Sequence, residues 1–227
     1  MSKLIYVGKT KDVYDNQDGT YTLKLKDDAT GKDGVFDPGE NTVGLQIQGL
    51  GRQSLQVSKH YFEKLIEAGI PTHYVDCDLD EVTMKVKPIT SFGEGVEFIC
   101  RCKADGSFLR RYGAYTTFGT DLDYFVEVTL KDDERQDPPI NKDALERLKI
   151  MTEEEYEICK NLTVQATKLI EKDLNEKGLT LFDLKFEFGL YNGEVLLIDE
   201  ISAGCMRVYK EGMKVPPLEL GKYILES

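Results

Sequence analysis

Charged and apolar side chains alternate along the segment FDLKFEFG, in the last quarter of the chain. Apolar residues at every second position are typical of a strand with one face on a core. The opposite face then carries the charged groups of Asp183, Lys185 and Glu187 in one line. A second apolar segment, VLLIDEIS at residues 195–202, delivers Asp199 and Glu200 after a turn signal. So many formal charges beside apolar strands favour a site that holds Mg²⁺ and phosphate.

The turn between these two segments decides whether their carboxylates meet. A loop with an odd number of residues, such as 192–194, sets Glu187 directly opposite Asp199, whereas a two-residue Asn-Gly turn sets it opposite Ile198. We predict the odd loop, with a glycine in the left-handed region. The two carboxylates then lie about 5 Å apart at Cβ and can share or bridge divalent cations. The alternative is a solvated polar face on which Lys185 pairs with a carboxylate.

A glycine and two lysines follow the first predicted strand, in the segment GKTKDVY. Gly8 lets the backbone approach a phosphate, and Lys9 and Lys11 project from one side of an extended segment. The segment lacks the GxxxxGK[ST] pattern of a P-loop. It therefore indicates either a phosphate contact of another kind or a solvated lysine loop.

Arginines form a dense cationic cluster in the middle of this acidic chain. Arg101, Arg110 and Arg111 lie close in sequence to Ser107, and Arg207 comes later. The planar guanidinium group suits phosphate and carboxylate oxygens. Neighbouring positions on a helix point in different directions, so we expect at most one of the paired arginines in a site. Alternatively, the arginines pair with surplus surface carboxylates.

Composition limits the class of protein. The chain has 227 residues, enough for one domain of two lobes or for two small domains, and 41% of them are hydrophobic. The 41 acidic residues outnumber the 29 basic ones, which gives a net charge of −12. A nucleic-acid partner is not expected, because the phosphate backbone requires a basic surface. A membrane partner is not expected either, because no apolar run approaches the roughly 20 residues of a membrane span.

Cysteine and histidine usage points to a cytoplasmic protein without thiol or histidine catalysis. The five cysteines are odd in number and lack Cys-x-x-Cys spacing, which argues for a reducing compartment and against disulfides or structural zinc. The N-terminal MSKLIYVG has no signal-peptide pattern. The two histidines, His60 and His73, lie in helix and helix-to-strand contexts, so a Ser-His-Asp or Cys-His hydrolase is disfavoured.

Periodicity and turn signals predict an α+β fold, in which strands and helices do not alternate regularly. The clearest element is a helix over 153–176, which begins with a capping box of Thr152 and Glu155. Ser54 or Ser58 is expected to cap the first helix. The other predicted elements are strands over 3–7, 20–26, 73–75, 83–86, 96–101 and 125–130, helices over 54–68 and 107–112, and connections over 9–19, 27–44 and 132–143.

Seven segments resemble, in the same order, the motifs of the SAICAR synthetase (phosphoribosylaminoimidazole-succinocarboxamide synthase) family. GKTKDVY matches the family's opening GKAKxVY, and the pair DLKFEFG and DEIS is specific. Together the motifs span almost the whole chain. They lie at residues 8–14, 26–30, 97–101, 106–107, 137–141, 183–189 and 199–202.

The resemblance implies an ATP- and Mg²⁺-dependent ligase of purine biosynthesis. Such an enzyme joins the carboxylate of a phosphoribosyl aminoimidazole carboxylate to the amine of L-aspartate and yields the succinocarboxamide, ADP and phosphate. The fold implied is an N-terminal ATP-binding lobe with an antiparallel sheet over 1–90 and a substrate- and metal-binding lobe over 91–227, with the nucleotide between them. The resemblance also implies a homodimer.

Roles for single residues follow from the positions that match the family's motifs. The resemblance implies that the nucleotide is contacted by Gly8, Lys9, Lys11, Val13, Glu187 and Asp199, and that the last two also hold Mg²⁺. It implies that Asp183 and Lys185 lie beside the reacting groups. It also implies that the ribose-phosphate end of the substrate is bound by Arg101, Ser107 and Arg207.

Some positions depart from the family pattern, chiefly around the substrate. The family's Arg-Asn is Arg101-Cys102 here, and its Ser-Pro-Asp loop is Ser-Ala-Gly at 202–204. Further departures lie at 31–32 and 51–54. A lost hydrogen-bond partner can change specificity by orders of magnitude. The chain is therefore a divergent synthetase or a paralogue that ligates another phosphorylated carboxylate. A third interpretation, an inactive nucleotide-binding regulatory protein, is disfavoured because the phosphate- and metal-site residues are retained.

Overall fold

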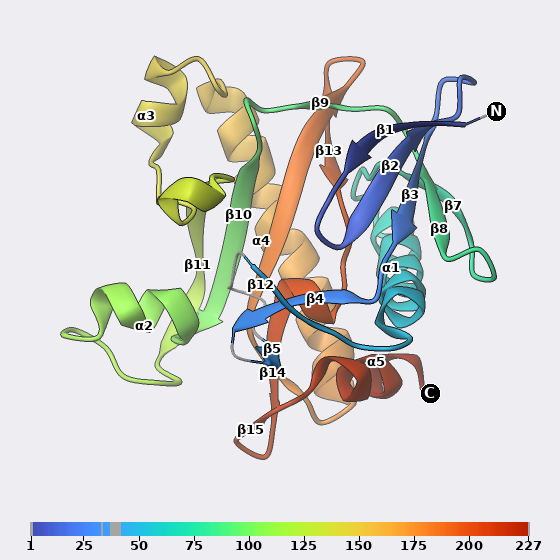
Figure 1. The fold of residues 1–227 in the computed structure, drawn as a ribbon. Coiled ribbons are helices and arrows are strands. Elements are labelled where there is room, and N and C mark those ends of the chain that lie inside the picture. The colour runs from blue at the N-terminus through green and yellow to red at the C-terminus, as the bar shows by residue number, and fades with distance from the viewer. Residues whose placement is uncertain (1, 33, 37–41, 227) are drawn as a thin grey trace.

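The computed structural model describes residues 2–32, 34–36 and 42–226 (Figure 1). Within these residues, the N-terminal part forms a five-stranded antiparallel sheet in the order β1-β2-β3-β8-β7. Its strands are β1 (Lys3–Val7), β2 (Lys11–Asp15), β3 (Tyr21–Leu25), β7 (Tyr74–Asp78) and β8 (Thr83–Val86). Four of them overlap predicted strands. The fifth, β2, is a correction, because we predicted a connection over 9–19.

The C-terminal part forms a seven-stranded sheet, counted over the same residues, around the long strand β12 (Thr180–Tyr191). One edge of β12 pairs with β10 and β9, and the other with β14 and β13, all antiparallel. The remaining strands are β9 (Thr90–Ser91), β10 (Val96–Lys103), β11 (Asp121–Leu130), β13 (Glu194–Ile198), β14 (Met206–Lys210) and β15 (Met213–Lys214). The predicted α+β class is confirmed.

Helix α4 (Glu153–Glu176) runs along the seven-stranded sheet and buries its apolar face against it (Figure 1). It begins with the predicted capping box, in which the Thr152 hydroxyl accepts from the Glu155 N–H and the Glu155 carboxylate accepts from the Thr152 N–H. The shorter helical segments are α2 (Gly106–Tyr112), η1 (Asp133–Arg135), α3 (Lys142–Arg147), η2 (Ala203–Cys205) and α5 (Pro217–Leu225). The helix predicted over 107–112 is confirmed by α2.

Helix α1 (Leu50–Glu67) begins before its predicted start, and neither predicted serine caps it. Its cap residue is Gly49, in the left-handed conformation at φ 85°. The Asp27 carboxylate accepts from the N–H groups of Gly49 and Gly51, each at 2.9 Å. A carboxylate distant in sequence therefore satisfies the free N–H groups of the first turn.

The segment 27–44 is not mainly loop, as we predicted from its glycines and aspartates. Its described residues contribute to a three-stranded sheet in the order β5-β4-β6. The strands are β4 (Asp28–Lys32), β5 (Val35–Phe36) and β6 (Val43–Gln46). Residues 33 and 37–41 of the predicted loop lie outside the described residues.

The β12–β13 hairpin closes with a two-residue turn, so the predicted odd loop is wrong. Asn192 and Gly193 form the turn, with φ of 52° and 83°. Positive φ at both positions is the type I′ geometry, whose twist matches the right-handed twist of the flanking strands. Glu187 is consequently opposite Ile198, and Asp199 lies one position beyond the paired residue.

One cluster of buried apolar residues extends from α1 and the first sheet to α4 and β12. The C-terminal helix α5 packs on α1, so the end of the chain returns to its N-terminal part (Figure 1). A boundary near residue 90 is therefore not visible as a separate core, and the division into lobes stays a prediction. Among the described helices, none combines the length and the apolar character that a membrane crossing requires.

A buried carboxylate ties α1 to α4. Asp173 on α4 accepts from the Tyr61 hydroxyl at 3.3 Å and pairs with Lys64, while His60 Nε2 lies 3.5 Å away. Burial alone would raise the pKa of Asp173, but His60 and Lys64 outweigh it and lower that pKa below its ordinary 3.8. The stabilising effect of this carboxylate is therefore complete above about pH 4 and is lost as the pH falls through the depressed folded-state pKa.

We expect Asp173→Asn to lower the free energy of unfolding by about 2 kcal/mol at pH 7, because it leaves Lys64 without its buried partner. The difference from the wild type should shrink at pH 3, where the wild-type carboxylate is also losing its advantage. Urea unfolding at the two pH values measures both. Asp80→Asn, at a side chain that is 93% exposed, is the matched control and should change stability little. An equal loss at pH 7 and pH 3 would contradict the role of this charge.

Candidate functional site

A cleft of about 1320 Å³ opens between the N-terminal sheet and the seven-stranded sheet. Cationic and carboxylate side chains line it in roughly equal numbers, although the whole chain is strongly acidic. The structure brings every site residue predicted from the sequence to this one cleft. They are Gly8, Lys9, Lys11, Val13, Arg101, Ser107, Asp183, Lys185, Glu187, Asp199 and Arg207.

Strand β12 aims its charged face at the cleft, as its alternation predicted. Leu184 and Phe186 are almost fully buried in the core on the opposite face. Asp183, Lys185 and Glu187 line the cleft, and both of these carboxylate residues are more than 90% buried. Strands on both sides of β12 therefore determine which partners these charged groups meet.

Asp183 lies between two arginines on neighbouring strands. It is directly opposite Arg101 of β10 on one side and Arg207 of β14 on the other. Arg101 Nη1 donates to Asp183 Oδ2 at 3.1 Å, and Arg207 Nη1 donates to Oδ1 and Oδ2 at 3.1 and 2.9 Å. Paired, hydrogen-bonded burial is what makes such charges tolerable in a sheet.

Glu127 of β11 and Ser107 of α2 complete the setting of Arg101. Arg101 Nε and Nη2 donate to Glu127 Oε2 at 2.9 and 2.6 Å, and Nη2 also donates to Ser107 Oγ at 2.9 Å. Arg111 Nη2 reaches the same Glu127 oxygen at 2.5 Å. Arg110 lines the cleft as well, so the expectation that at most one of these two neighbours would do so is wrong.

Gly106 allows Arg207 to lie where it does. It has φ +54°, and a Cβ built on it would lie 2.7 Å from the guanidinium carbon of Arg207. Gly8 is similarly confined, because its Cβ would lie 2.5 Å from the Lys11 carbonyl oxygen. A backbone that must come this close to a neighbour requires glycine.

Lys185 separates two carboxylates that the sheet sets face to face. Glu97 of β10 is directly opposite Glu187, a pairing that is unfavourable for like charges. Lys185 Nζ lies 2.7 Å from Glu97 and 3.4 Å from Glu187, and Lys131 Nζ donates to both Glu187 oxygens at 2.9 and 3.0 Å. Thr129 donates to the other Glu97 oxygen at 3.0 Å. Burial alone would lower the pKa of Lys185, but the two carboxylates raise it well above its ordinary value, so the group stays an ammonium.

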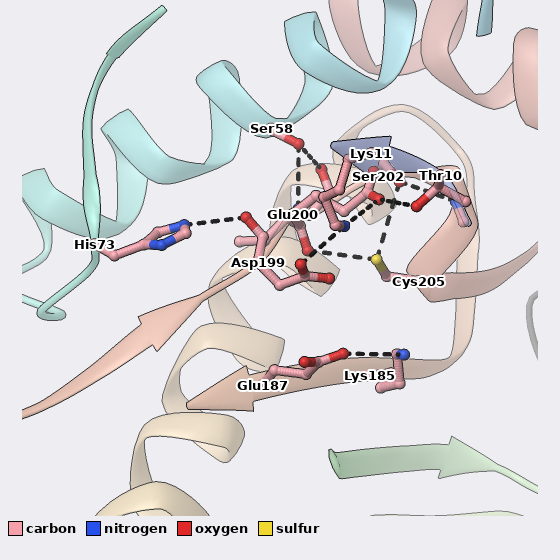
Figure 2. Close-up of polar contacts among 12 residues, drawn as sticks. Thr10, Lys11, Ser58, His73, Lys185, Glu187, Asp199, Glu200, Ser202 and Cys205 are labelled. Carbon is pink, nitrogen blue, oxygen red and sulfur yellow. Dashed lines mark hydrogen bonds and ion pairs between the residues drawn. The ribbon is translucent and has the colours of Figure 1, made fainter. Parts of the chain in front are cut away.

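Asp199 reaches the cleft by leaving the strand. Directly opposite residues of an antiparallel pair share a face, so Ile198 shares the face of Glu187 and a regular Asp199 would point to the core. Asp199 instead has φ 71°, and its carboxylate pairs with Lys11 Nζ at 2.8 Å (Figure 2). Burial alone would raise the pKa of Asp199, but Lys11 and other lysines of the cleft lower it, so the carboxylate is ionised.

Lys11 of β2 is held by two neighbouring carboxylates. Its Nζ lies 2.8 Å from Asp199 and 2.8 Å from Glu200, and the Thr10 hydroxyl donates to Glu200 at 3.4 Å (Figure 2). Consecutive side chains of a regular strand point apart, so the left-handed residue is what lets both reach one ammonium. Burial alone would lower the pKa of Lys11, but Asp199 and Glu200 raise it above its ordinary value.

The other two predicted nucleotide residues lie at the N-terminal wall of the cleft. Lys9 Nζ pairs with Asp133 at 2.5 Å, and both side chains are about half exposed. Val13 of β2 is partly buried and packs against the core cluster while it lines the cleft. A cationic group beside an apolar surface is a combination that a nucleotide with a flat base and a phosphate chain can use.

Several cleft residues were missed by reasoning from the sequence, although signals existed. Glu97 stands at even spacing from Arg101 along an alternating strand, which places the two on one face. Glu127 and Lys131 lie on or just after a predicted strand, also at even spacing. Glu200 was named beside Asp199 but given no role, because strand alternation gave no reason to place both in the cleft. That placement needs the positive φ of Asp199, which the sequence does not reveal.

The arrangement has two ends with different chemistry. Arginines with a serine gather at one end around Asp183, and such groups bind phosphate or carboxylate oxygens. At the other end, which we call the acidic end, Lys11 and Lys185 lie among Glu187, Asp199 and Glu200, and carboxylate oxygens are ligands that a hard cation prefers. Over the described residues, no group of three or more His, Cys, Asp or Glu side chains could enclose a metal ion by itself. A cation here would have to share its ligands with a bound substrate.

Comparison with known proteins agrees with the motifs. The family model described as SAICAR synthetase matches residues 4–221. A phosphoribosylaminoimidazole-succinocarboxamide synthase of Clostridium tetani is 55% identical over 98% of this chain and 99% of its own length.

Solved structures give the same result for the fold. A SAICAR synthetase in complex with ADP superposes with a TM-score of 0.85 at 25% identity, covering 98% of this chain and 97% of the other. A phosphoribosylaminoimidazole-succinocarboxamide synthase of Ehrlichia chaffeensis gives 0.83 at 26% identity, covering 98% and 91%.

We expect Glu97 and Lys185 to be energetically coupled. Glu97→Gln removes the nearer partner of the partly buried Lys185 ammonium and should lower the free energy of unfolding by about 2–3 kcal/mol. In a double-mutant cycle with Lys185→Met, urea unfolding at pH 7 should give a coupling of about 1 kcal/mol or more. The exposed pair of Lys142 and Glu153 is the matched control, with expected coupling below about 0.5 kcal/mol. Equal coupling in the two cycles would contradict the interpretation.

Proposed function

The chain belongs to the SAICAR synthetase family, and we propose that its cleft uses ATP to join a phosphoribosyl aminoimidazole carboxylate to L-aspartate. The products are SAICAR, ADP and phosphate, in purine biosynthesis. A family match over nearly the whole chain supports this reaction, and one cleft is lined by residues from each of the seven segments that match the family's motifs.

The reaction needs an activated carboxylate. A carboxylate is a poor electrophile, so one of its oxygens attacks the γ-phosphorus of ATP, and the bond to the β–γ bridging oxygen breaks to release ADP. The amine of aspartate then attacks the acyl carbon of the acyl phosphate, phosphate leaves, and the nitrogen loses a proton as the amide forms. Charge accumulates on phosphoryl oxygens, and fixed ammonium groups such as Lys11 and Lys185 are suited to neutralise it.

The residues at the acidic end fit Mg²⁺ that arrives with a nucleotide. Mg²⁺ takes oxygen ligands and is usually held by one or two carboxylates together with substrate phosphates. Glu187 and Asp199 supply two carboxylates on the same cleft, and Asp199 is ionised. When bound, Mg²⁺ neutralises the phosphate oxygens and orients them. The proposed metal ligands are therefore Glu187 and Asp199.

The nucleotide would lie against the N-terminal sheet. The backbone at Gly8 and the ammonium groups of Lys9 and Lys11 would contact its phosphates, and Val13 would contact its base or sugar. A related enzyme, described as a SAICAR synthetase, has been solved in complex with ADP. We place the ATP-binding lobe at 1–90 and the substrate- and metal-binding lobe at 91–227, because the five-stranded sheet uses no residue beyond 86.

The phosphoribosyl substrate would occupy the arginine end. Arg101, Ser107 and Arg207 would grip its phosphate, and Asp183 would keep the two guanidinium groups in place. Lys185, further along the same strand, would then face the carboxylate that reacts. In this proposal, Asp183, Lys185 and Glu187 would face, in that order along β12, the substrate phosphate, the reacting carboxylate and the metal–nucleotide complex.

The departure from the family pattern at Cys102 does not favour a change of substrate, whereas the departure at 202–204 does border the cleft, through Ser202 and Gly204. Cys102 packs in the core, on the face of β10 opposite Arg101, so the residue at this position does not need to contact a ligand. The 55% identity to a relative named for this reaction also favours the purine step over a paralogous ligase. The proposal includes a homodimer in the cytoplasm, which sedimentation and fractionation would test.

One assay tests the reaction. Purified protein is incubated with the aminoimidazole carboxylate, aspartate, ATP and Mg²⁺, and product absorbance and ADP release are followed together. Product formation supports the proposal. ADP release only with other phosphorylated acids would favour a paralogue, and nucleotide binding without any turnover would favour a regulatory protein.

We expect Glu187→Gln to lower kcat at least about 100-fold, because it removes a charged oxygen pair from the proposed metal site. Glu194→Gln, on an exposed residue of the same hairpin, makes the same change in charge and should leave kcat within about twofold. Steady-state rates at saturating Mg²⁺ measure both. Near-normal turnover in Glu187→Gln would refute its assignment.

We expect Ser107→Ala to raise KM for the phosphoribosyl substrate about tenfold, since it removes the hydroxyl that accepts from Arg101. KM for ATP should stay within about twofold, because Ser107 lies at the arginine end of the cleft. Initial rates with each substrate varied in turn give the two constants. A parallel rise in both would argue against separate ends.

A further inference from the structure

The turn at Asp199–Glu200–Ile201 is held by side chains from outside it. His73 Nε2 lies 3.1 Å from the Asp199 carbonyl oxygen, and Cys205 Sγ donates to the Glu200 carbonyl at 3.4 Å (Figure 2). The Ser58 hydroxyl donates to the Ile201 carbonyl and accepts from the Ile201 N–H, both at 3.2 Å. Each of the three carbonyls of this turn therefore accepts a hydrogen bond from a side chain. We call Ser58, His73 and Cys205 the turn bracket.

His73 continues a hydrogen-bond ladder past the end of β13. Its backbone N–H donates to the Leu197 carbonyl at 3.0 Å, beside the parallel bridge of Thr72 and Leu197. Two residues later the chain turns away at Asp199, and the imidazole takes the place of the next backbone donor. Because a carbonyl oxygen only accepts, the ring must carry its hydrogen on Nε2.

The ring is held firmly by its surroundings. His73 is 3% exposed and packs at 5.6 Å, between ring centroids, against Phe62 of α1. Ser58 lies on the same helix and is fully buried. One helix therefore supports two of the three bracket residues.

The turn needs such support, because Asp199 adopts a left-handed conformation without being glycine. Such residues are strained and persist only where the surroundings determine them. Relaxation of Asp199 to extended backbone would continue the strand and turn its carboxylate toward the core, away from Lys11. The backbone conformation at Asp199 thus controls where the Asp199 carboxylate lies.

We propose that His73 is a positioning residue, whose Nε2–H bond to the Asp199 carbonyl holds the Asp199 carboxylate in the cleft for the metal–nucleotide complex. This inference rests on the proposed function, since it takes Asp199 as a ligand of Mg²⁺. His73 contacts neither substrate nor metal.

The test is magnesium-dependent nucleotide binding, which needs no turnover. Calorimetry gives the dissociation constant of ADP with Mg²⁺ and with EDTA for the wild type, His73→Phe and His73→Gln. Phenylalanine keeps the packing on Phe62 but loses the donor, and we expect the gain in affinity from Mg²⁺ to fall about tenfold. Glutamine can reach with an amide N–H and should restore the gain to within about threefold.

His60→Phe is the matched control, because His60 is the other histidine of the chain and pairs with Asp173 on α4. It should leave the magnesium dependence unchanged even if it lowers stability. A gain that stays within threefold of wild type in folded His73→Phe overturns the proposal. The same holds if glutamine fails to restore it. A wild type that binds no nucleotide refutes the proposed function instead, which separates the two failures.

A measurement on the wild type covers the case in which His73→Phe does not fold. Long-range ¹H–¹⁵N NMR at pH 7 distinguishes the two neutral forms of a histidine ring. We expect the hydrogen of His73 on Nε2. A hydrogen on Nδ1 alone would leave the Asp199 carbonyl without its donor and would overturn the proposal.

Discussion

A two-residue turn and strand alternation together impose the constraint on which the cleft depends. The turn at Asn192 and Gly193 places Ile198 opposite Glu187, so continued strand geometry would bury the next carboxylate in the core. The chain leaves the regular strand geometry at Asp199, whose left-handed conformation directs its side chain to the cleft. The proposed metal site and the anchoring of Lys11 both depend on this single break in the strand. A strained residue at a functional position is a common way to store such a geometry.

Charge balance is the second organising feature. The chain carries a net charge of −12, yet cationic and carboxylate side chains line its cleft in roughly equal numbers. The sheet achieves this by setting each buried cation beside a carboxylate on a neighbouring strand. Asp183 pairs with Arg101 and Arg207, and Lys185 pairs with Glu97 and Glu187. Charges fixed before a ligand arrives need little rearrangement during the reaction, which is the condition for effective electrostatic stabilisation.

The sequence was sufficient for those features in which local pattern and tertiary structure agree. The helix α4 and the charged face of β12 could be predicted from periodicity, and the capping box from the spacing of Thr152 and Glu155. The segment of β2 could not, because it offers few apolar residues and gains its structure from pairing on both sides. The start of α1 depended on a carboxylate at Asp27, distant in sequence. Local pattern carries no information about such partners.

The candidate site shows the same division. Residue types and motif spacing identified the side chains that the cleft gathers, but not the backbone that gathers them. The odd loop was expected to set Glu187 directly opposite Asp199; the structure does not pair them, but it brings both side chains to the same cleft by another route. Sequence reasoning named Glu200 beside Asp199 but assigned it no role, because Glu200 reaches Lys11 only where the regular strand geometry fails one residue earlier. His73 was judged structural, and its bond to a carbonyl across the fold lay outside any local pattern.

Gly106 constrains how this chain can change over generations. A methyl group there would collide with the Arg207 guanidinium and push it off Asp183. A coding change at this codon would touch no substrate atom, yet it would disturb the arginine that the substrate's phosphate is proposed to meet. At Gly106, the limit on which residues are tolerated therefore comes from a charged side chain packed against the backbone, and not from contact with a ligand.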